Sequence, residues 1–133
     1  MTRAASRYQA MDLQGMSGPQ LVVFLYSSLL ASLRQAHRAI EAAEHESRCR
    51  ALCRARDIVC ELAFSLDRAA GGPLAENLAS LYEYAIREIT QVDLHPDAAR
   101  LARLTGLIAS LHEAWQSAAA QVAETEVAAA ARS

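Results

Sequence analysis

Apolar side chains between Leu101 and Val122 follow one another at steps of three and four residues without a gap. Steps of that size place the side chains on one face of an α-helix. Three earlier stretches repeat the pattern, and no segment shows the alternation of a β-strand. Because a helix with one apolar face buries it against other helices, we expect an all-α fold, an antiparallel up-and-down four-helix bundle.

Glycine and proline separate the four expected helices. The first begins near Pro19, where either Ser17 or Gly18 caps the helix. Gly71-Gly72-Pro73 ends the second helix and starts the third, and the connection is so short that these two helices must lie antiparallel as neighbours. Pro96 pushes its preceding residue out of the helical region and so ends the third. Within a single domain, we expect an arm at 1–16, helices at about 19–44, 48–69, 73–94 and 96–124, and a frayed tail at 125–133.

Composition and charge point away from nucleic acids and membranes. The chain of 133 residues carries a formal net charge of −2, and its one basic cluster, Arg48 to Arg56, is followed by Asp57 and Glu61. No stretch approaches the roughly 20 apolar residues of a membrane span. The three cysteines have no framework spacing and follow no signal sequence, which favours a reducing, cytoplasmic location. We therefore expect neither nucleic-acid binding nor membrane insertion.

Four potential metal ligands, His45, Cys49, Cys53 and Asp57, are spaced four residues apart. On one helix this spacing distributes them along the surface, whereas a tetrahedral metal site needs converging ligands. We therefore expect no metal, and we interpret Cys49 and Cys53 as small packing residues. No catalytic motif occurs, so we expect a protein that is not an enzyme and carries no cofactor.

The histidines leave one alternative open. Histidine phosphotransfer domains are also four-helix bundles with an exposed histidine, and they are similar to this chain in architecture. His37 is followed by Arg-Ala-Ile, not by the lysine and glycine that surround the phosphorylated histidine in those domains. A phosphotransfer domain is therefore the weaker interpretation.

Polar and aromatic residues follow the Gly71-Gly72-Pro73 break. In one interpretation Asn77 makes a buried contact that fixes the register of the bundle, and the rings of Tyr82 and Tyr84 are buried while their hydroxyls stay in water. In the other, the third helix is apolar beyond a single stripe, because Tyr82 follows Leu78 by four residues and Tyr84 points elsewhere. A helix that is apolar on two faces needs a second partner, and this predicts a binding groove.

The N-terminal arm is unusually apolar for a chain end. Tyr8, Met11, Leu13 and Met16 precede the first expected helix. These side chains could fold back over an exposed groove as a removable lid. A short packed helix without a regulatory part is the alternative.

Taken together, these segments resemble the flagellin secretion chaperones of the bacterial flagellar export system. The resemblance covers about residues 8–118 and depends on the order and spacing of several motifs. The first motifs are Tyr8 in the arm and, in the opening helix, Pro19 and Leu21 followed by Leu25-Tyr26. The central motifs are Glu61-Leu62 followed by Ser65-Leu66-Asp67, then Gly71-Gly72, then Ala75, Asn77-Leu78 and Leu81-Tyr82-x-Tyr84. The last motif, in the closing helix, is Leu111 followed by Glu113-Ala114-Trp115.

The resemblance implies a four-helix bundle preceded by a short segment that covers an apolar site. Such a protein binds the disordered C-terminal region of flagellin in the cytoplasm, prevents its premature polymerisation and brings it to the export gate protein at the membrane. It is not an enzyme. The residues expected to form the lid or contact flagellin are Tyr8, Met11, Leu13, Tyr26, Leu62, Phe64, Asn77, Leu78, Leu81, Tyr82 and Tyr84.

A structural or regulatory bundle without flagellin binding is the main alternative. Such a protein would self-associate through the same apolar face, as a homodimer that depends on Tyr82.

Overall fold

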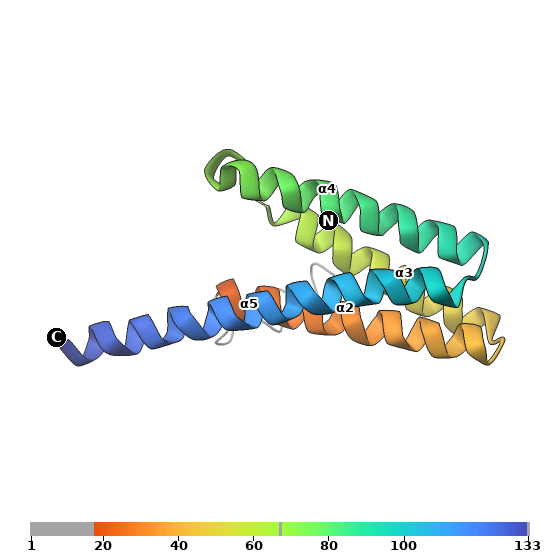
Figure 1. Ribbon diagram of the computed structural model, residues 1–133, viewed down its shortest axis with the longest axis horizontal. Helices are drawn as coiled ribbons and strands as arrows, with labels where there is room; N and C mark the ends of the chain where they lie inside the picture. The colour runs from red at the N-terminus through yellow and green to blue at the C-terminus, as the bar shows by residue number, and fades with distance from the viewer. Residues whose placement is uncertain (1–17, 67, 133) are drawn as a thin grey trace.

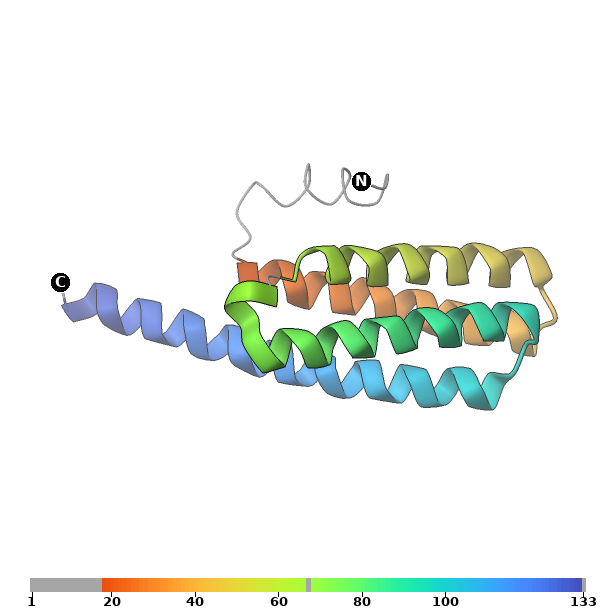
Figure 2. The same cartoon turned by 90° about the horizontal axis from the view of Figure 1, so that it is seen from above.

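The computed structural model describes residues 18–66 and 68–132, and for residues 68–70 it describes the backbone alone. This part of the chain forms four antiparallel α-helices (Figure 1). Successive helices pack side by side, and the last packs against the first, which closes a ring of four (Figure 2). The expected up-and-down four-helix bundle is confirmed. Its helices are α2 (Gly18–Glu41), α3 (His45–Phe64), α4 (Arg68–Leu94) and α5 (Ala98–Arg132).

The core consists of aliphatic side chains from all four helices, with alanines where α2 meets α3. Ala36, Ala51 and Ala55 are fully buried, and small side chains let two helix axes approach closely. The α2–α3 contact is accordingly the most extensive in the bundle, and the α4–α5 contact is the least. The largest aliphatic side chains that are almost completely buried are Leu29, Leu33, Leu52, Ile58, Leu62, Ile89, Leu101, Leu104 and Ile108.

Helix α2 ends earlier than expected, at Glu41, because the chain turns left-handed at Ala43. The backbone φ of Ala43 is 56°, a conformation that glycine usually supplies at this position. Two hydrogen bonds close the turn, from the Glu44 N–H to the Ala39 carbonyl at 2.8 Å and from the Ala43 N–H to the Ile40 carbonyl at 3.2 Å. Helix α3 can therefore start at His45, three residues before the expected boundary.

The connection between α3 and α4 also differs from the expectation. Helix α3 ends at Phe64, five residues early, where the Ser65 hydroxyl donates a hydrogen bond to the Leu62 carbonyl at 2.8 Å. A hydroxyl that bonds to the backbone competes with continuation of the helix. The first break therefore comes directly after Phe64, and a second interruption lies at Gly72, whose backbone is not helical, with φ 55° and ψ −136°.

Helix α5 extends well beyond the other three (Figures 1 and 2). Its expected apolar stripe is buried from Leu101 to Ile108, half-buried at Trp115 and exposed at Val122, because the helix has by then passed the end of the bundle. We expected a frayed tail from residue 125, whereas α5 continues to Arg132. None of the described helices combines the length and the apolar composition needed to cross a bilayer.

Candidate functional site

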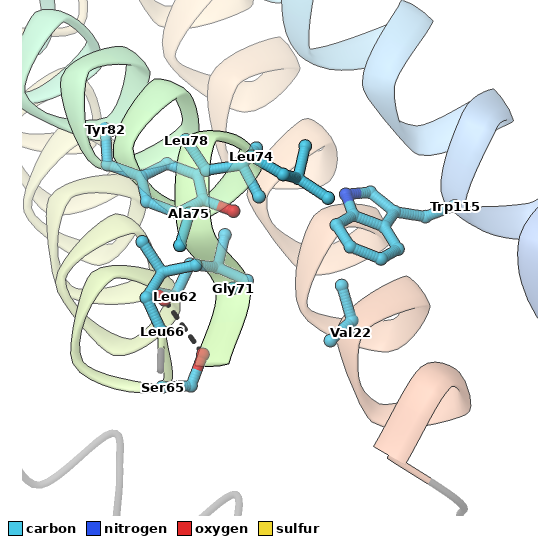
Figure 3. A pocket seen from close by; sticks show the side chains of 10 residues that line it. All are labelled: Val22, Leu62, Ser65, Leu66, Gly71, Leu74, Ala75, Leu78, Tyr82 and Trp115. Atoms are coloured by element: carbon cyan, nitrogen blue, oxygen red, sulfur yellow. Dashed lines mark hydrogen bonds between the residues drawn. The ribbon is translucent and has the colours of Figure 1, made fainter. Parts of the chain in front are cut away.

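An apolar cavity of about 360 Å³ lies at the end of the bundle where α3 turns into α4 (Figure 3). Val22 of α2 and Trp115 of α5 form one wall, and residues of α3 and α4 lie opposite them. The two helix pairs, α2 with α5 and α3 with α4, diverge toward this end (Figure 1). The lining residues are Val22, Leu62, Ser65, Leu66, Gly71, Leu74, Ala75, Leu78, Tyr82 and Trp115.

The cavity wall is uncharged. Its two hydroxyl groups are occupied internally, since Ser65 bonds to the Leu62 carbonyl and the Tyr82 hydroxyl bonds to the Tyr26 hydroxyl. Sites of this volume bind ligands mainly through apolar contact, with a few polar groups setting orientation. The residues that line the cavity in the described part of the chain therefore suit an aliphatic or aromatic side chain better than a charged ligand.

Gly71 lines the α4 side of the cavity, and Gly72 follows it at the kink of the helix. A Cβ atom added to Gly71 would lie only 2.6 Å from the Cβ of Ala75, and the positive φ of Gly72 strains any other residue. Gly71-Gly72 therefore lets the chain turn tightly against the next turn of α4. The sequence had indicated a helix break at these glycines, and the backbone of Gly72 does interrupt the helix, while Gly71 also forms part of the cavity wall.

Two aromatic residues of the cavity wall, Tyr82 and Trp115, contact the buried Tyr26. The hydroxyls of Tyr26 on α2 and Tyr82 on α4 are 2.7 Å apart, and both side chains are almost completely buried. The Tyr26 ring lies 6.3 Å from the Trp115 ring at a tilt of 40°, within the range of favourable aromatic pairs. Burial raises the pKa of both tyrosines, so both hydroxyls are protonated and one donates to the other.

The structure brings only part of the expected site together. Leu62, Leu78 and Tyr82 line the cavity. Tyr26 lies in the core, and Leu81 packs half-buried against it. The expectation that the Tyr82 hydroxyl stays in water is wrong, because that hydroxyl is buried against Tyr26.

Three further expected residues lie outside the cavity. Phe64 is 81% exposed at the end of α3, and Tyr84 points away from the core with 38% exposure. Asn77 is also exposed, so the expectation that it fixes the register from inside the bundle is wrong. The lid residues Tyr8, Met11 and Leu13 lie outside the described residues.

Sequence reasoning missed most of the cavity wall. Trp115 and Val22 were assigned to helix core stripes, and Ser65 and Leu66 were placed inside the second helix. The resemblance motifs contained Ser65, Leu66, Gly71, Ala75 and Trp115, and this signal could have identified them.

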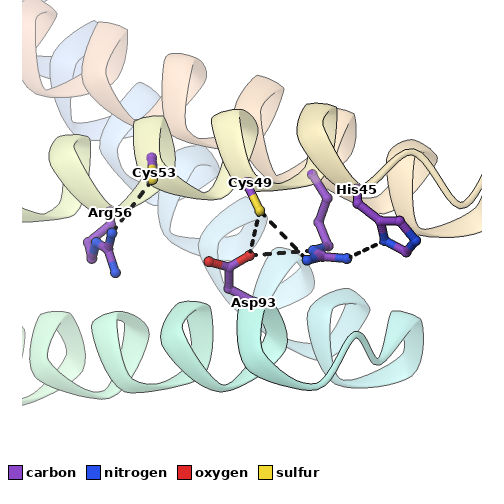
Figure 4. Close-up of polar contacts among 6 residues, drawn as sticks. His45, Cys49, Cys53, Arg56 and Asp93 are labelled. Atoms are coloured by element: carbon purple, nitrogen blue, oxygen red, sulfur yellow. Dashed lines mark hydrogen bonds and ion pairs between the residues drawn. The ribbon is translucent and has the colours of Figure 1, made fainter.

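The cysteine and histidine row forms polar contacts along the surface of α3 (Figure 4). Asp93 of α4 accepts hydrogen bonds from Arg48 at 3.4 Å and Cys49 at 3.5 Å, while the His45 ring lies 3.0 Å from Arg48. Among the described residues no three potential ligands converge on one point. The interpretation of Cys49 and Cys53 as packing residues is wrong, because both are exposed.

Comparison with known proteins assigns the family. A family model described as "Flagellar protein FliS" matches residues 1–122. The chain belongs to the FliS family. The FliS match contains every cavity-lining residue and ends within the extension of α5.

Two curated FliS proteins and one solved structure are similar to this chain. The flagellar secretion chaperone FliS of Salmonella typhimurium is 33% identical over 98 residues, 73% of each chain. That of Bacillus subtilis is 29% identical over 111 residues, 84% of this chain and 82% of the relative. A crystal structure of a bacterial flagellar chaperone superposes with a TM-score of 0.74 at 16% identity, covering 90% of this chain and 97% of the other, which shows the same fold.

Proposed function

We propose that this FliS protein is a cytoplasmic chaperone that binds the disordered C-terminal region of flagellin through the apolar cavity. In this proposal it prevents premature polymerisation and delivers flagellin to the export gate protein, without catalysing a reaction. The cavity is the observation that carries the proposal, because its described wall is apolar, uncharged and open to solvent. The names of the curated relatives, flagellar secretion chaperones, support the same role.

A disordered client that folds on binding suits such a site. Ordering the client costs conformational entropy, so binding needs a large contact surface with a few well-buried anchors. Client helices bind in apolar grooves through side chains spaced three and four residues apart. One client side chain can enter the cavity, while Leu74 and Phe64, 62% and 81% exposed, extend the apolar surface at that end of the bundle.

The arm at residues 1–16 is proposed as the lid of this site. Its apolar side chains, Tyr8, Met11 and Leu13, would compete with the client for the same surface, because an exposed apolar patch is unfavourable in water. Removing residues 1–16 is therefore expected to change the affinity for a flagellin C-terminal peptide, measured by calorimetric titration.

Leu74 offers a test with a matched control on the same helix. Leu74 lies on the cavity wall and Leu94 at the far end of α4, and the two are almost equally exposed, at 62% and 64%. We expect Leu74→Gln to weaken binding of the flagellin peptide by about tenfold, because burying a leucine contributes roughly 1.5–3 kcal/mol. Leu94→Gln should leave binding unchanged. Trp115, the single tryptophan, lines the cavity and reports binding by fluorescence.

Two outcomes contradict the proposal. One is a wild-type protein that forms no complex with flagellin. The other is equal binding by Leu74→Gln, Leu94→Gln and the wild type, which would place the client elsewhere. Both leucines are exposed, so neither substitution is expected to unfold the bundle.

A further inference from the structure

Helix α5 carries an open depression of about 410 Å³ beyond the apolar cavity. Among the described residues, its lining comes from α5 alone, from the α5 extension at residues 116–132 that leaves the bundle (Figures 1 and 2). A depression bordered by one helix has an open side, where a neighbouring helix would complete it. Its lining residues, which we call the α5 strip, are Ala118, Gln121, Val122, Thr125 and Glu126.

The α5 strip continues the face of α5 that packs against α4. Arg100 donates its hydrogen bonds to a carboxylate of α4 from this side of the helix. Leu104, Leu111, Ala118 and Thr125 follow one another at steps of seven residues, or about two helical turns, so they lie on one face. Leu104 is buried and Leu111 half-buried, whereas Ala118 and Thr125 are exposed. This face therefore loses its α4 neighbour beyond Leu111.

The course of α4 explains why the strip is uncovered. Leu74 of α4 lies opposite Trp115 of α5 across the cavity (Figure 3). Because the two helices are antiparallel, the residues before Leu74 would have to cover the strip. The helix is instead interrupted at Gly72, and the chain there leads back to α3 (Figure 2). The position beside the strip that a longer α4 would occupy is therefore open, and it is continuous with the cavity.

We propose that a helix of the flagellin C-terminal region takes this position along the α5 strip, with one apolar side chain in the cavity and a lysine or arginine beside Glu126. The inference rests on the proposed function and adds a second contact surface to the cavity. Ala118 and Val122 allow close approach of a helix, and Glu126 forms no ion pair with a described residue. Trp115 and Glu126 are about three helical turns apart, roughly 16 Å, so the client cation lies that far from the apolar anchor.

The strip would select among clients by charge. The cavity lining lies entirely within the residues that match the FliS family, whereas Thr125 and Glu126 lie beyond the end of that match at residue 122. A carboxylate favours a client with a cation at the matching position and disfavours one with an acid there. In this inference the cavity binds the apolar anchor, and the strip adds a preference that belongs to this chain.

Val122 and Val127 give a matched pair for testing the apolar part of the strip. Val122 lies in the strip and is 41% exposed, while Val127 lies on the other side of the same helix and is 70% exposed. We expect Val122→Gln in the full-length protein to weaken binding of the flagellin peptide about fivefold in calorimetric titration. Val127→Gln should leave binding unchanged. Glutamine forms helices at least as well as valine, so α5 is retained in both variants.

Glu126 and Glu124 give the matched pair for charge, because Glu124 points away from the strip. We expect Glu126→Arg to weaken binding about threefold or more at low salt, with a smaller effect at high salt, and Glu124→Arg to change it little. Each lysine and arginine of the peptide is then replaced by glutamine in turn. One replacement should weaken binding to the wild type and improve binding to Glu126→Arg, which identifies the client cation.

The possible failures are distinguishable. Loss of affinity in Leu74→Gln with unchanged binding by Val122→Gln and Glu126→Arg would overturn the inference and leave the proposed function standing. Tighter binding by Val122→Gln would show that residues 1–17 or a second copy cover the strip, and equal effects of Glu124→Arg and Glu126→Arg would show an effect of net charge alone. Both results would overturn the inference. A wild-type protein that forms no complex with the peptide would remove the proposed function and the inference together.

Discussion

At the scale of single residues, the hydrogen bond between Tyr26 and Tyr82 holds one side chain of the cavity wall in place. Tyr82 lines the cavity with its ring, while its hydroxyl reaches Tyr26 across the bundle at 2.7 Å. The two hydroxyls are hydrogen-bonded to each other, the Trp115 side chain is a further hydrogen-bond partner of Tyr26, and both tyrosine side chains are almost completely buried. A buried hydroxyl without a partner costs more than a hydrogen bond contributes when it is made, so the two residues should behave as a unit.

We therefore expect Tyr26→Phe and Tyr82→Phe each to lower the free energy of unfolding by about 1–2 kcal/mol, because each removes the hydrogen bond between two buried hydroxyls. The double variant should cost less than the sum of the two single ones, since both single variants remove the same hydrogen bond between the hydroxyls. Urea unfolding of the four proteins gives the coupling energy of this cycle. Additive losses would show that the two hydroxyls do not depend on each other.

At the scale of helices, α4 and α5 share the least extensive contact, and one ion pair joins them near their connection. Arg100 of α5 donates two hydrogen bonds to the carboxylate of Glu88 on α4, at 2.8 and 2.7 Å. These hydrogen bonds are the main cause of a lowered pKa at Glu88, and nearby arginines act in the same direction. The pair therefore stabilises the contact only while Glu88 is ionised.

The lowered pKa makes this contact pH-dependent. Its contribution to stability is present above the ordinary carboxyl pKa of 4.5 and is lost as the pH falls through the lowered pKa of the folded state. We expect Glu88→Gln to destabilise the protein at neutral pH and to have little effect well below pH 4.5. Urea unfolding at both pH values measures the difference.

Glu83 provides the control for this experiment. It is an exposed carboxylate on the same helix and forms no ion pair with a described residue. Glu83→Gln should change stability little at either pH. Equal effects of the two substitutions at neutral pH would contradict the role assigned to the Glu88–Arg100 pair.

At the scale of the whole molecule, the two ends of the bundle differ. At the end where α4 meets α5, Ala85, Ile89 and Val92 are completely buried. At the other end the helix pairs diverge, the cavity opens, and Leu74 is mostly exposed (Figures 1 and 3). Regions with fewer buried apolar contacts open at lower free energy, so we expect the end that carries the proposed client site to be the less stable one.

Hydrogen exchange measures this difference directly. We expect amide groups at residues 74–79 to exchange faster than those at 85–92 of the same helix, because the former lie beside the cavity. Binding of a flagellin peptide should slow exchange at 74–79 more than at 85–92. Uniform exchange along α4, or equal protection of both segments by the peptide, would contradict this account.

The amino-acid sequence by itself determined which residues are helical and which helix faces are buried. The stripe from Leu101 to Ile108 and the cavity residues Leu62 and Leu78 could be predicted, because helical periodicity is a local property. The ends of helices were predicted less well. Helix α3 ends at a hydrogen bond of Ser65, and α2 ends at a turn around Ala43 that backbone hydrogen bonds close. Whether these bonds form depends on the path that the chain takes between the helices in the folded protein.

Only the tertiary structure decided what each buried face meets. Periodicity indicates that Tyr26, Tyr82 and Trp115 belong to apolar stripes, but it does not indicate that the two hydroxyls pair or that Trp115 faces Leu74 across a cavity. Nor does it show that α5 passes the end of the bundle and leaves Val122 exposed. These features depend on the relative lengths and spacing of helices that are distant in sequence, and a local pattern contains no information about them.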